Sequence, residues 1–102
     1  MLSLSKNEID LGNLEKGSKA HFQVTVKNDY NIDVTPQLSA SCGCTVPTLE
    51  PATIPANGTA QLLGVFDTAG KQGFQSKNIY VAFKNNGAPI TLSLNFKANV
   101  NA

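Results

Sequence analysis

The feature of this chain that most restricts its fold is an alternation of apolar and polar residues. Over residues 90–100 apolar side chains occupy every second position and polar side chains lie between them. Residues 22–26 and 79–83 follow the same period of two. Because successive side chains of an extended strand point to opposite faces, each segment predicts a strand that is buried on one face only. Such strands must bury their apolar faces against a second layer.

Weaker patterns predict further strands at residues 8–11, 33–40, 45–46 and 60–67. Turn-forming pairs separate these segments, as at Asn57-Gly58, Ala69-Gly70 and Asn86-Gly87. We find no window with the apolar spacing of a helix and the matching start and stop signals. The sequence therefore predicts an all-β protein, a two-sheet antiparallel β-sandwich of about seven to eight strands.

The length and composition predict one domain over residues 1–102, with no linker or internal repeat. Eight basic residues, all of them lysines, nearly balance seven acidic residues, so we expect no nucleic-acid partner. No apolar run approaches the roughly 20 residues that cross a bilayer, so we expect no membrane insertion. The first ten residues lack the apolar core of a signal peptide. We expect a cytoplasmic or virion-associated protein, or the mature form of an exported one.

The segment Ser41-Cys42-Gly43-Cys44-Thr45 holds both cysteines of the chain. In an extended backbone the Cα atoms of Cys42 and Cys44 would lie about 6.6 Å apart, at the long limit for a disulfide. One interpretation is a reducible Cys42–Cys44 bridge used in redox exchange. The other is structural, with one cysteine filling the core and the other at the surface or in a turn.

Metal and enzymatic sites lack the residues they need. His21 is the only histidine and Met1 the only methionine, so a single chain has few further ligands that could bind zinc or copper together with the two thiols. The carboxylates occur singly along the chain, and no motif for a nucleophile or an oxyanion hole is present. We therefore predict no enzyme, no catalytic residue, no cofactor, no metal and no small-molecule substrate.

The order of several motifs resembles that of a bacterial domain family of unknown function with an SCGCT signature. The resemblance covers nearly the whole chain and rests on residues 8–11, 22–28, 41–47, 54–58, 65–67 and 77–81, with Gly70 and Gly73. That family is similar to the Hydin-like and major-sperm-protein-like immunoglobulin folds. The resemblance implies an immunoglobulin-like sandwich that serves as a structural or protein-binding module. The resemblance indicates the position of the cysteine motif in this chain but implies no role for it.

We therefore expect a non-catalytic module that binds a protein partner or associates with itself through loops or a sheet edge. Such a module would suit a decoration or adhesion domain of a larger assembly, such as a phage particle or the cell envelope. The predicted interaction surface is the Pro-rich segment 41–55 together with two residues of an earlier turn; its candidate residues are Asp29, Tyr30, Ser41, Thr45, Pro47 and Glu50. The alternative is a thiol module in which Cys42 and Cys44 exchange electrons or hold a soft metal.

Overall fold

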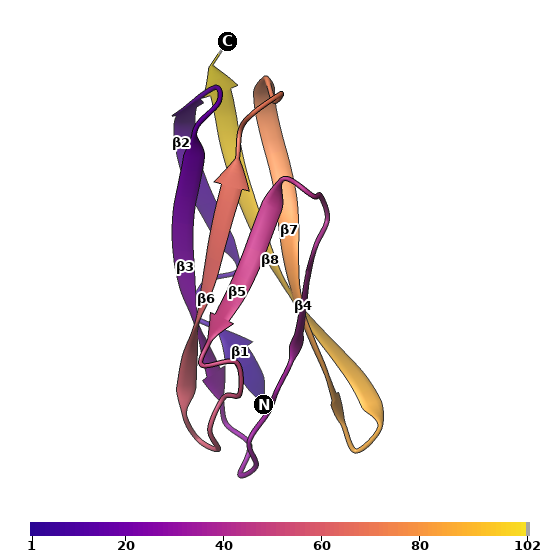
Figure 1. Ribbon diagram of the computed structural model, residues 1–102. Helices are drawn as coiled ribbons and strands as arrows, with labels where there is room; N and C mark the ends of the chain where they lie inside the picture. Colours follow the sequence, from indigo (N-terminus) through magenta and orange to yellow (C-terminus); the bar gives the residue numbers. More distant parts are fainter. Residues whose placement is uncertain (102) are drawn as a thin grey trace.

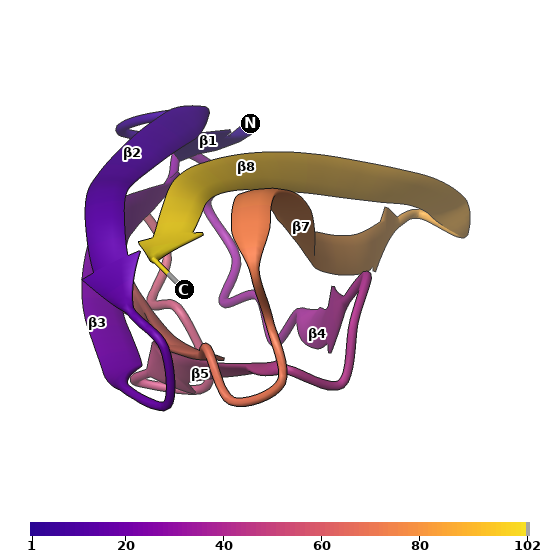
Figure 2. The same ribbon diagram turned by 90° about the horizontal axis from the view of Figure 1, so that it is seen from above.

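The computed structural model describes residues 1–101, which form eight β-strands (Figure 1). Their bounds are β1 Leu2–Leu4, β2 Glu8–Glu15, β3 Lys19–Asn28, β4 Gln37–Ala40, β5 Thr45–Glu50, β6 Thr59–Asp67, β7 Gly73–Asn85 and β8 Ala88–Asn101. They build two four-stranded sheets, with strand orders β1-β3-β6-β5 and β2-β8-β7-β4. The predicted all-β sandwich is confirmed. Viewed from above, the sheets face each other across a shared interior (Figure 2).

One pair departs from the antiparallel arrangement of the sheets, because β2 runs parallel to β8. The preceding strand β1 pairs antiparallel with β3 in the other sheet. Residues 5–7 carry the chain from one sheet to the other without reversing its direction, so β2 enters the second sheet alongside β8. The register of β2 shifts between Asp10 and Asn13, where Gly12 adopts a φ of 72° and forms a bulge.

The structure also adds one strand and changes the bounds of predicted ones. Strand β1 was not predicted, since a three-residue strand shows too little alternation. The predicted strand 33–40 forms only at Gln37–Ala40, because Val34 exchanges backbone hydrogen bonds with Ile54, outside the named strands. The predicted strand 45–46 extends to Glu50 through Pro47. Proline is tolerated there because β5 lies at the edge of its sheet.

The core lies between the two sheets and is built from the alternating apolar residues. Its largest buried side chains include Phe66, Phe96, Ile54 and Leu62. The Phe66 and Phe96 rings lie 5.3 Å apart between centroids, and the half-buried Phe22 ring lies 4.9 Å from Phe96. These rings join both sheets, since β3 and β6 belong to one sheet and β8 to the other.

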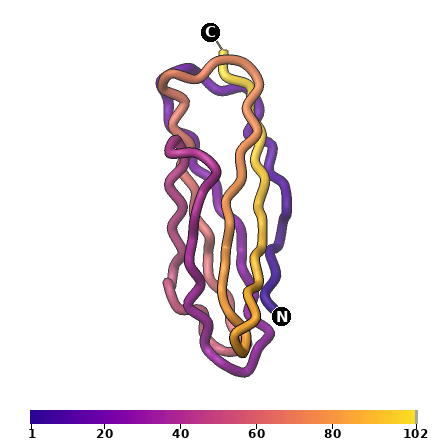
Figure 3. Tube along the Cα trace, turned by 90° about the vertical axis from the view of Figure 1, so that its right-hand side faces the viewer, coloured from indigo at the N-terminus to yellow at the C-terminus, as the bar shows by residue number. Residues whose placement is uncertain are grey.

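The molecule is elongated, with extents of 48 × 21 × 17 Å. The chain begins near one end of the long axis, and the described part of β8 runs to the other end (Figure 3). We call these the β1 end and the β8 end. Strand β7 continues into β8 through Asn86 and Gly87, which have φ values of 51° and 82° as a tight hairpin requires. Among residues 1–101 we find no helix long and apolar enough to span a membrane.

Candidate functional site

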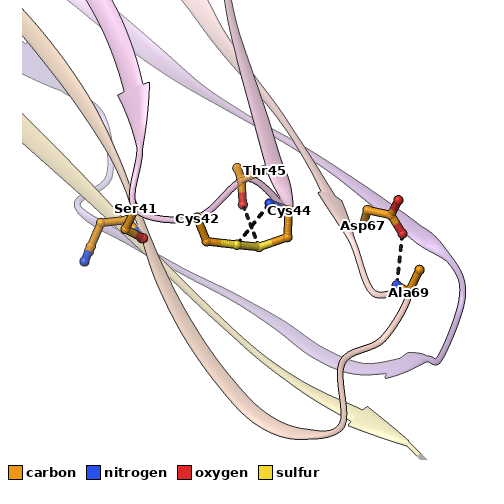
Figure 4. The surroundings of a disulfide bond; sticks show 7 residues. Ser41, Cys42, Cys44, Thr45, Asp67 and Ala69 are labelled. Atoms are coloured by element: carbon orange, nitrogen blue, oxygen red, sulfur yellow. Dashed lines mark hydrogen bonds between the residues drawn. A yellow bond between two sulfur atoms is a disulfide. The ribbon is translucent and has the colours of Figure 1, made fainter.

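The cysteine segment forms the turn that leads from β4 to β5, and so from one sheet to the other (Figure 4). In this turn Cys42 and Cys44 form a disulfide, with their Cα atoms 5.3 Å apart. The prediction from extended backbone placed these atoms farther apart. The separation is shorter because residues 41–44 curl into a turn, in which the Thr45 N–H donates to the Cys42 carbonyl at 3.3 Å.

Contacts within the turn and one hydrogen bond to β6 fix its shape. The Cys44 N–H lies 3.1 Å from the Cys42 Sγ atom, and the Thr45 Oγ1 atom lies 3.8 Å from the Cys44 Sγ atom. The Asp67 N–H donates to the Cys44 carbonyl at 2.9 Å, which extends the β5–β6 ladder by one residue. Both cysteines are half-buried, whereas the flanking Ser41 and Gly43 are exposed. The turn therefore presents a partly accessible disulfide.

No group of three or more His, Cys, Asp or Glu side chains in residues 1–101 is placed to hold a metal ion. His21 lies on the outer face of β3, where its register partner on β6 is Val65. The carboxylate of Asp67, the acidic residue drawn beside the turn in Figure 4, accepts a hydrogen bond from the Ala69 N–H at 2.9 Å.

The structure divides the predicted interaction residues between the two ends of the sandwich. Ser41 and Thr45 flank the cysteine turn, toward the β8 end. Asp29 and Tyr30 follow β3 at the β1 end, where the Asp29 N–H donates to the Met1 carbonyl at 2.9 Å. The segment 41–55 is thus not one loop, because strand β5 runs through its middle.

The side chains of these residues also differ in exposure. Thr45 is buried, and Pro47 is half-buried on the same inward face of β5. Tyr30 is half-buried and packs edge-on against Phe83, with ring centroids 5.7 Å apart. Asp29 is exposed and lies 3.8 Å from the Lys27 Nζ atom. Glu50 is exposed on the outward face of β5.

An apolar cluster that the sequence analysis did not identify lies on the outer face of the first sheet. It consists of Val46 of β5 with Leu63 and Val65 of β6, and we call it the β5–β6 face. Val46 is 61% exposed, and its register partner is Val65. A shallow hollow of about 470 Å³ adjoins it, lined by His21, Phe22, Gln23, Thr48, Glu50, Leu63, Gly64 and Val65.

The outer face of the second sheet is polar by comparison. Its central row runs from Ser39 of β4 through Tyr80 of β7 to Ser93 of β8. Farther along, the amide of Asn95 donates to Ser76, Lys77 and Asn78. The two sheets therefore differ in what they present to a partner: the first has the β5–β6 face, whereas the second has these polar rows and the exposed ring of Phe74 on β7.

Comparison with protein families gives one match. The model for DUF1573, described as a protein of unknown function, matches residues 2–100. No curated protein matches this chain.

Solved structures with the same fold share little sequence with this chain. A protein of unknown function from Porphyromonas gingivalis W83 matches with a TM-score of 0.78 and 17% identity, over 96% of this chain and 46% of that one. The ASH/PapD-like domain 7 of human CEP192 matches with a TM-score of 0.76 and 14% identity, over 99% and 86%. The Vibrio cholerae VesB protease matches with a TM-score of 0.73 and 13% identity, over 96% and 31%. The chain thus spans about half the length of the Porphyromonas protein.

Proposed function

Because this chain belongs to the DUF1573 family, whose function is unknown, we propose its role from its surface: a non-catalytic module that binds another protein. Family membership confirms the resemblance drawn from the SCGCT segment. The matches to parts of longer chains, at 46% and 31% of their lengths, support a module that works within or on a larger assembly. A decoration or adhesion role in a particle or envelope is one setting for such a module.

The observation that carries this proposal is the β5–β6 face. Val46 exposes an apolar side chain to solvent, and Leu63 and Val65 extend the apolar surface onto the next strand. Apolar clusters with a polar rim are typical of protein-binding surfaces. Here the rim consists of His21, Gln23 and the Thr48–Glu50 side of β5. The partner that fits is a folded protein whose own apolar side chain fills the hollow.

A Val46→Lys substitution is expected to weaken binding to that partner at least tenfold. It places a charge where apolar area would be buried, and burial of one valine side chain contributes about 1.5 kcal/mol, which corresponds to about a tenfold change in Kd. The partner is first identified by a photo-crosslinking residue at position 46 in the cells that produce the protein, then purified for calorimetric titration. Because Val46 is exposed, the variant should fold normally.

Ser93→Lys is the matched control, because Ser93 is exposed on the outer face of the opposite sheet. We expect this variant to bind as tightly as the unmodified protein. Equal crosslinking from positions 46 and 93, or an unchanged Kd for Val46→Lys, would show that the β5–β6 face is not the binding surface.

The disulfide favours a second candidate, exchange of electrons with a partner dithiol. In such a step the partner's two thiols reduce the Cys42–Cys44 bond, and the partner leaves as a disulfide while both cysteines gain a proton and become thiols. The half-buried sulfurs lie in a turn whose neighbours Ser41 and Gly43 are exposed, so an attacking thiolate has a route of approach.

The expected intact mass of the native protein is two hydrogens below that of the dithiol form, with no alkylation in the absence of reductant. Native incubation with dithiothreitol, used as the dithiol probe, should then expose two alkylatable thiols. The Cys42→Ser/Cys44→Ser variant should show neither change. Free thiols in the untreated protein, or a bond that dithiothreitol leaves intact until the protein unfolds, would exclude this candidate.

A further inference from the structure

The sandwich has four edge strands, and three of them are protected against pairing with another chain. Strand β1 has only three residues. Strand β2 carries the Gly12 bulge and the acidic side chains of Glu8 and Asp10. Short strands, bulges and charges all discourage edge-to-edge pairing.

Strand β5 is protected by the position of its proline. The hydrogen bond from the Asp67 N–H to the Cys44 carbonyl shows which residues of β5 direct their backbone groups toward β6 and which direct them away from it. On this basis the backbone groups of Thr45, Pro47 and Leu49 face the free edge. The Thr45 N–H is already donated to the Cys42 carbonyl, and Pro47 has no N–H. A strand added to β5 would therefore find few donors.

Strand β4 is only one residue longer than β1, but it has no bulge, charge or proline. Its sequence, Gln37-Leu38-Ser39-Ala40, contains no charge, proline or glycine. The hydrogen bond from the Ser41 N–H to the Asn78 carbonyl sets the alternation of the β4–β7 ladder, so that Ser39 pairs with Tyr80 on β7. The N–H and C=O groups of Leu38 and Ala40 then face the free edge. Neither residue has a backbone partner on that side within residues 1–101.

We propose that this edge pairs with the β4 strand of a second copy of the chain. The two strands run antiparallel about a two-fold axis at Ser39, so that Leu38 lies opposite the partner's Ala40 and Ala40 opposite the partner's Leu38. In this register the outward N–H and C=O groups of both residues find partners in the other copy. The β2-β8-β7-β4 sheet of one copy and the same sheet of the second copy then join into one continuous sheet.

Several features favour a second copy over a foreign segment. The edge is self-complementary, because each large side chain, Leu38, meets a small one, Ala40. No like charges oppose each other across the axis, since the facing residues are Ser39 and the partner's Ser39. The protein carries a formal net charge of only +1, so two copies repel each other weakly. This surface lies on the opposite sheet from the β5–β6 face, so the two sites can be tested separately.

Charge substitutions at Ser39 test the proposal. Ser39→Lys places two like charges opposite each other at the axis, and so does Ser39→Glu. Sedimentation velocity from micromolar to millimolar protein should show a reversible dimer for the unmodified chain. We expect each variant alone to be monomeric and an equimolar mixture of the two to dimerise again. Because Ser39 is exposed, both variants should fold.

Ser93→Lys is again the matched control, because it lies in the same row of the same face but away from the edge. This variant should dimerise like the unmodified protein. Amide hydrogen exchange gives a second measurement: exchange at Leu38 and Ala40 should slow as the protein is concentrated, whereas exchange at Leu49 should not. A monomer at millimolar concentration, or a dimer that Ser39→Lys does not weaken, overturns the proposal.

Discussion

Replacing Asn28 with Ala is expected to lower the free energy of unfolding by about 3–4 kcal/mol. This side chain is fully buried at the end of β3. Its amide nitrogen donates to the carbonyl oxygens of Ile32 at 2.9 Å, Ile54 at 3.1 Å and Pro55 at 3.2 Å. Its oxygen accepts from the Tyr30 N–H at 2.9 Å. Alanine would leave these buried and part-buried groups without partners and fill none of the space.

The Asn28→Asp variant adds a pH-dependent test of the same hydrogen bonds. A carboxylate accepts but cannot donate, so the ionised group would face carbonyl oxygens without a hydrogen to share. Burial there raises the pKa of the introduced carboxyl above its unfolded value of about 3.9. The variant should therefore lose stability as pH rises above about 4, until the folded carboxyl ionises too.

Urea unfolding of both variants at several pH values measures these effects. Asn31→Ala is the matched control, because Asn31 follows in the same turn, is exposed and makes no side-chain hydrogen bond within residues 1–101. Its unfolding free energy should change by less than about 0.5 kcal/mol. A similarly small loss in Asn28→Ala would contradict the structural role assigned to this amide.

Gly64→Ala is expected to lower the free energy of unfolding by about 2–3 kcal/mol. A Cβ atom at position 64 would lie closer than 3.0 Å to three ring carbons of Phe22 on the neighbouring strand. That ring cannot simply move aside, because it packs against Phe96 at a centroid distance of 4.9 Å. The glycine is therefore required by the close approach of an aromatic ring to the β6 backbone.

Gly43→Ala is the matched control for chemical denaturation, because a Cβ atom at Gly43 would meet nothing within 4 Å. Its unfolding free energy should stay within about 0.5 kcal/mol of the unmodified value. Phe22→Leu should relieve the clash, so the Gly64→Ala/Phe22→Leu double variant should be more stable than the sum of the single effects. Strictly additive losses would show that the ring does not set the requirement for glycine.

The architecture was predictable from the sequence where alternation is long. Residues 90–100 and 79–83 alternate cleanly because β8 and β7 each cover the core with one face, and both strands were found. The parallel placement of β2 was not predictable, because alternation shows which side of a strand is buried but not which strand lies beside it. The register shift at Gly12 and the Val34–Ile54 bridge likewise depend on contacts between distant residues.

The candidate site was predictable only in part. The cysteine pair stood out by composition, but its Cα separation depended on a turn that extended geometry does not describe. The β5–β6 face had a signal that was not used: residues 62–66 are apolar on both strand faces, apart from Gly64, so Leu63 and Val65 had to point away from the core. Asp29 and Ser41 were grouped in one surface, although residues 30–40, which end in β4, carry the chain from the β1 end toward the β8 end between them.

The parallel pairing of β2 with β8 affects how the domain responds to a pulling force. The chain starts near the β1 end, and β8 runs to the opposite end of the 48 Å axis. Tension applied between these two ends pulls β1 along β3 and β2 along β8, so the hydrogen bonds of each ladder bear the load together. A hairpin pulled from its two adjacent ends instead opens one bond at a time. The sandwich is thus arranged to transmit tension along its length with its strands in shear.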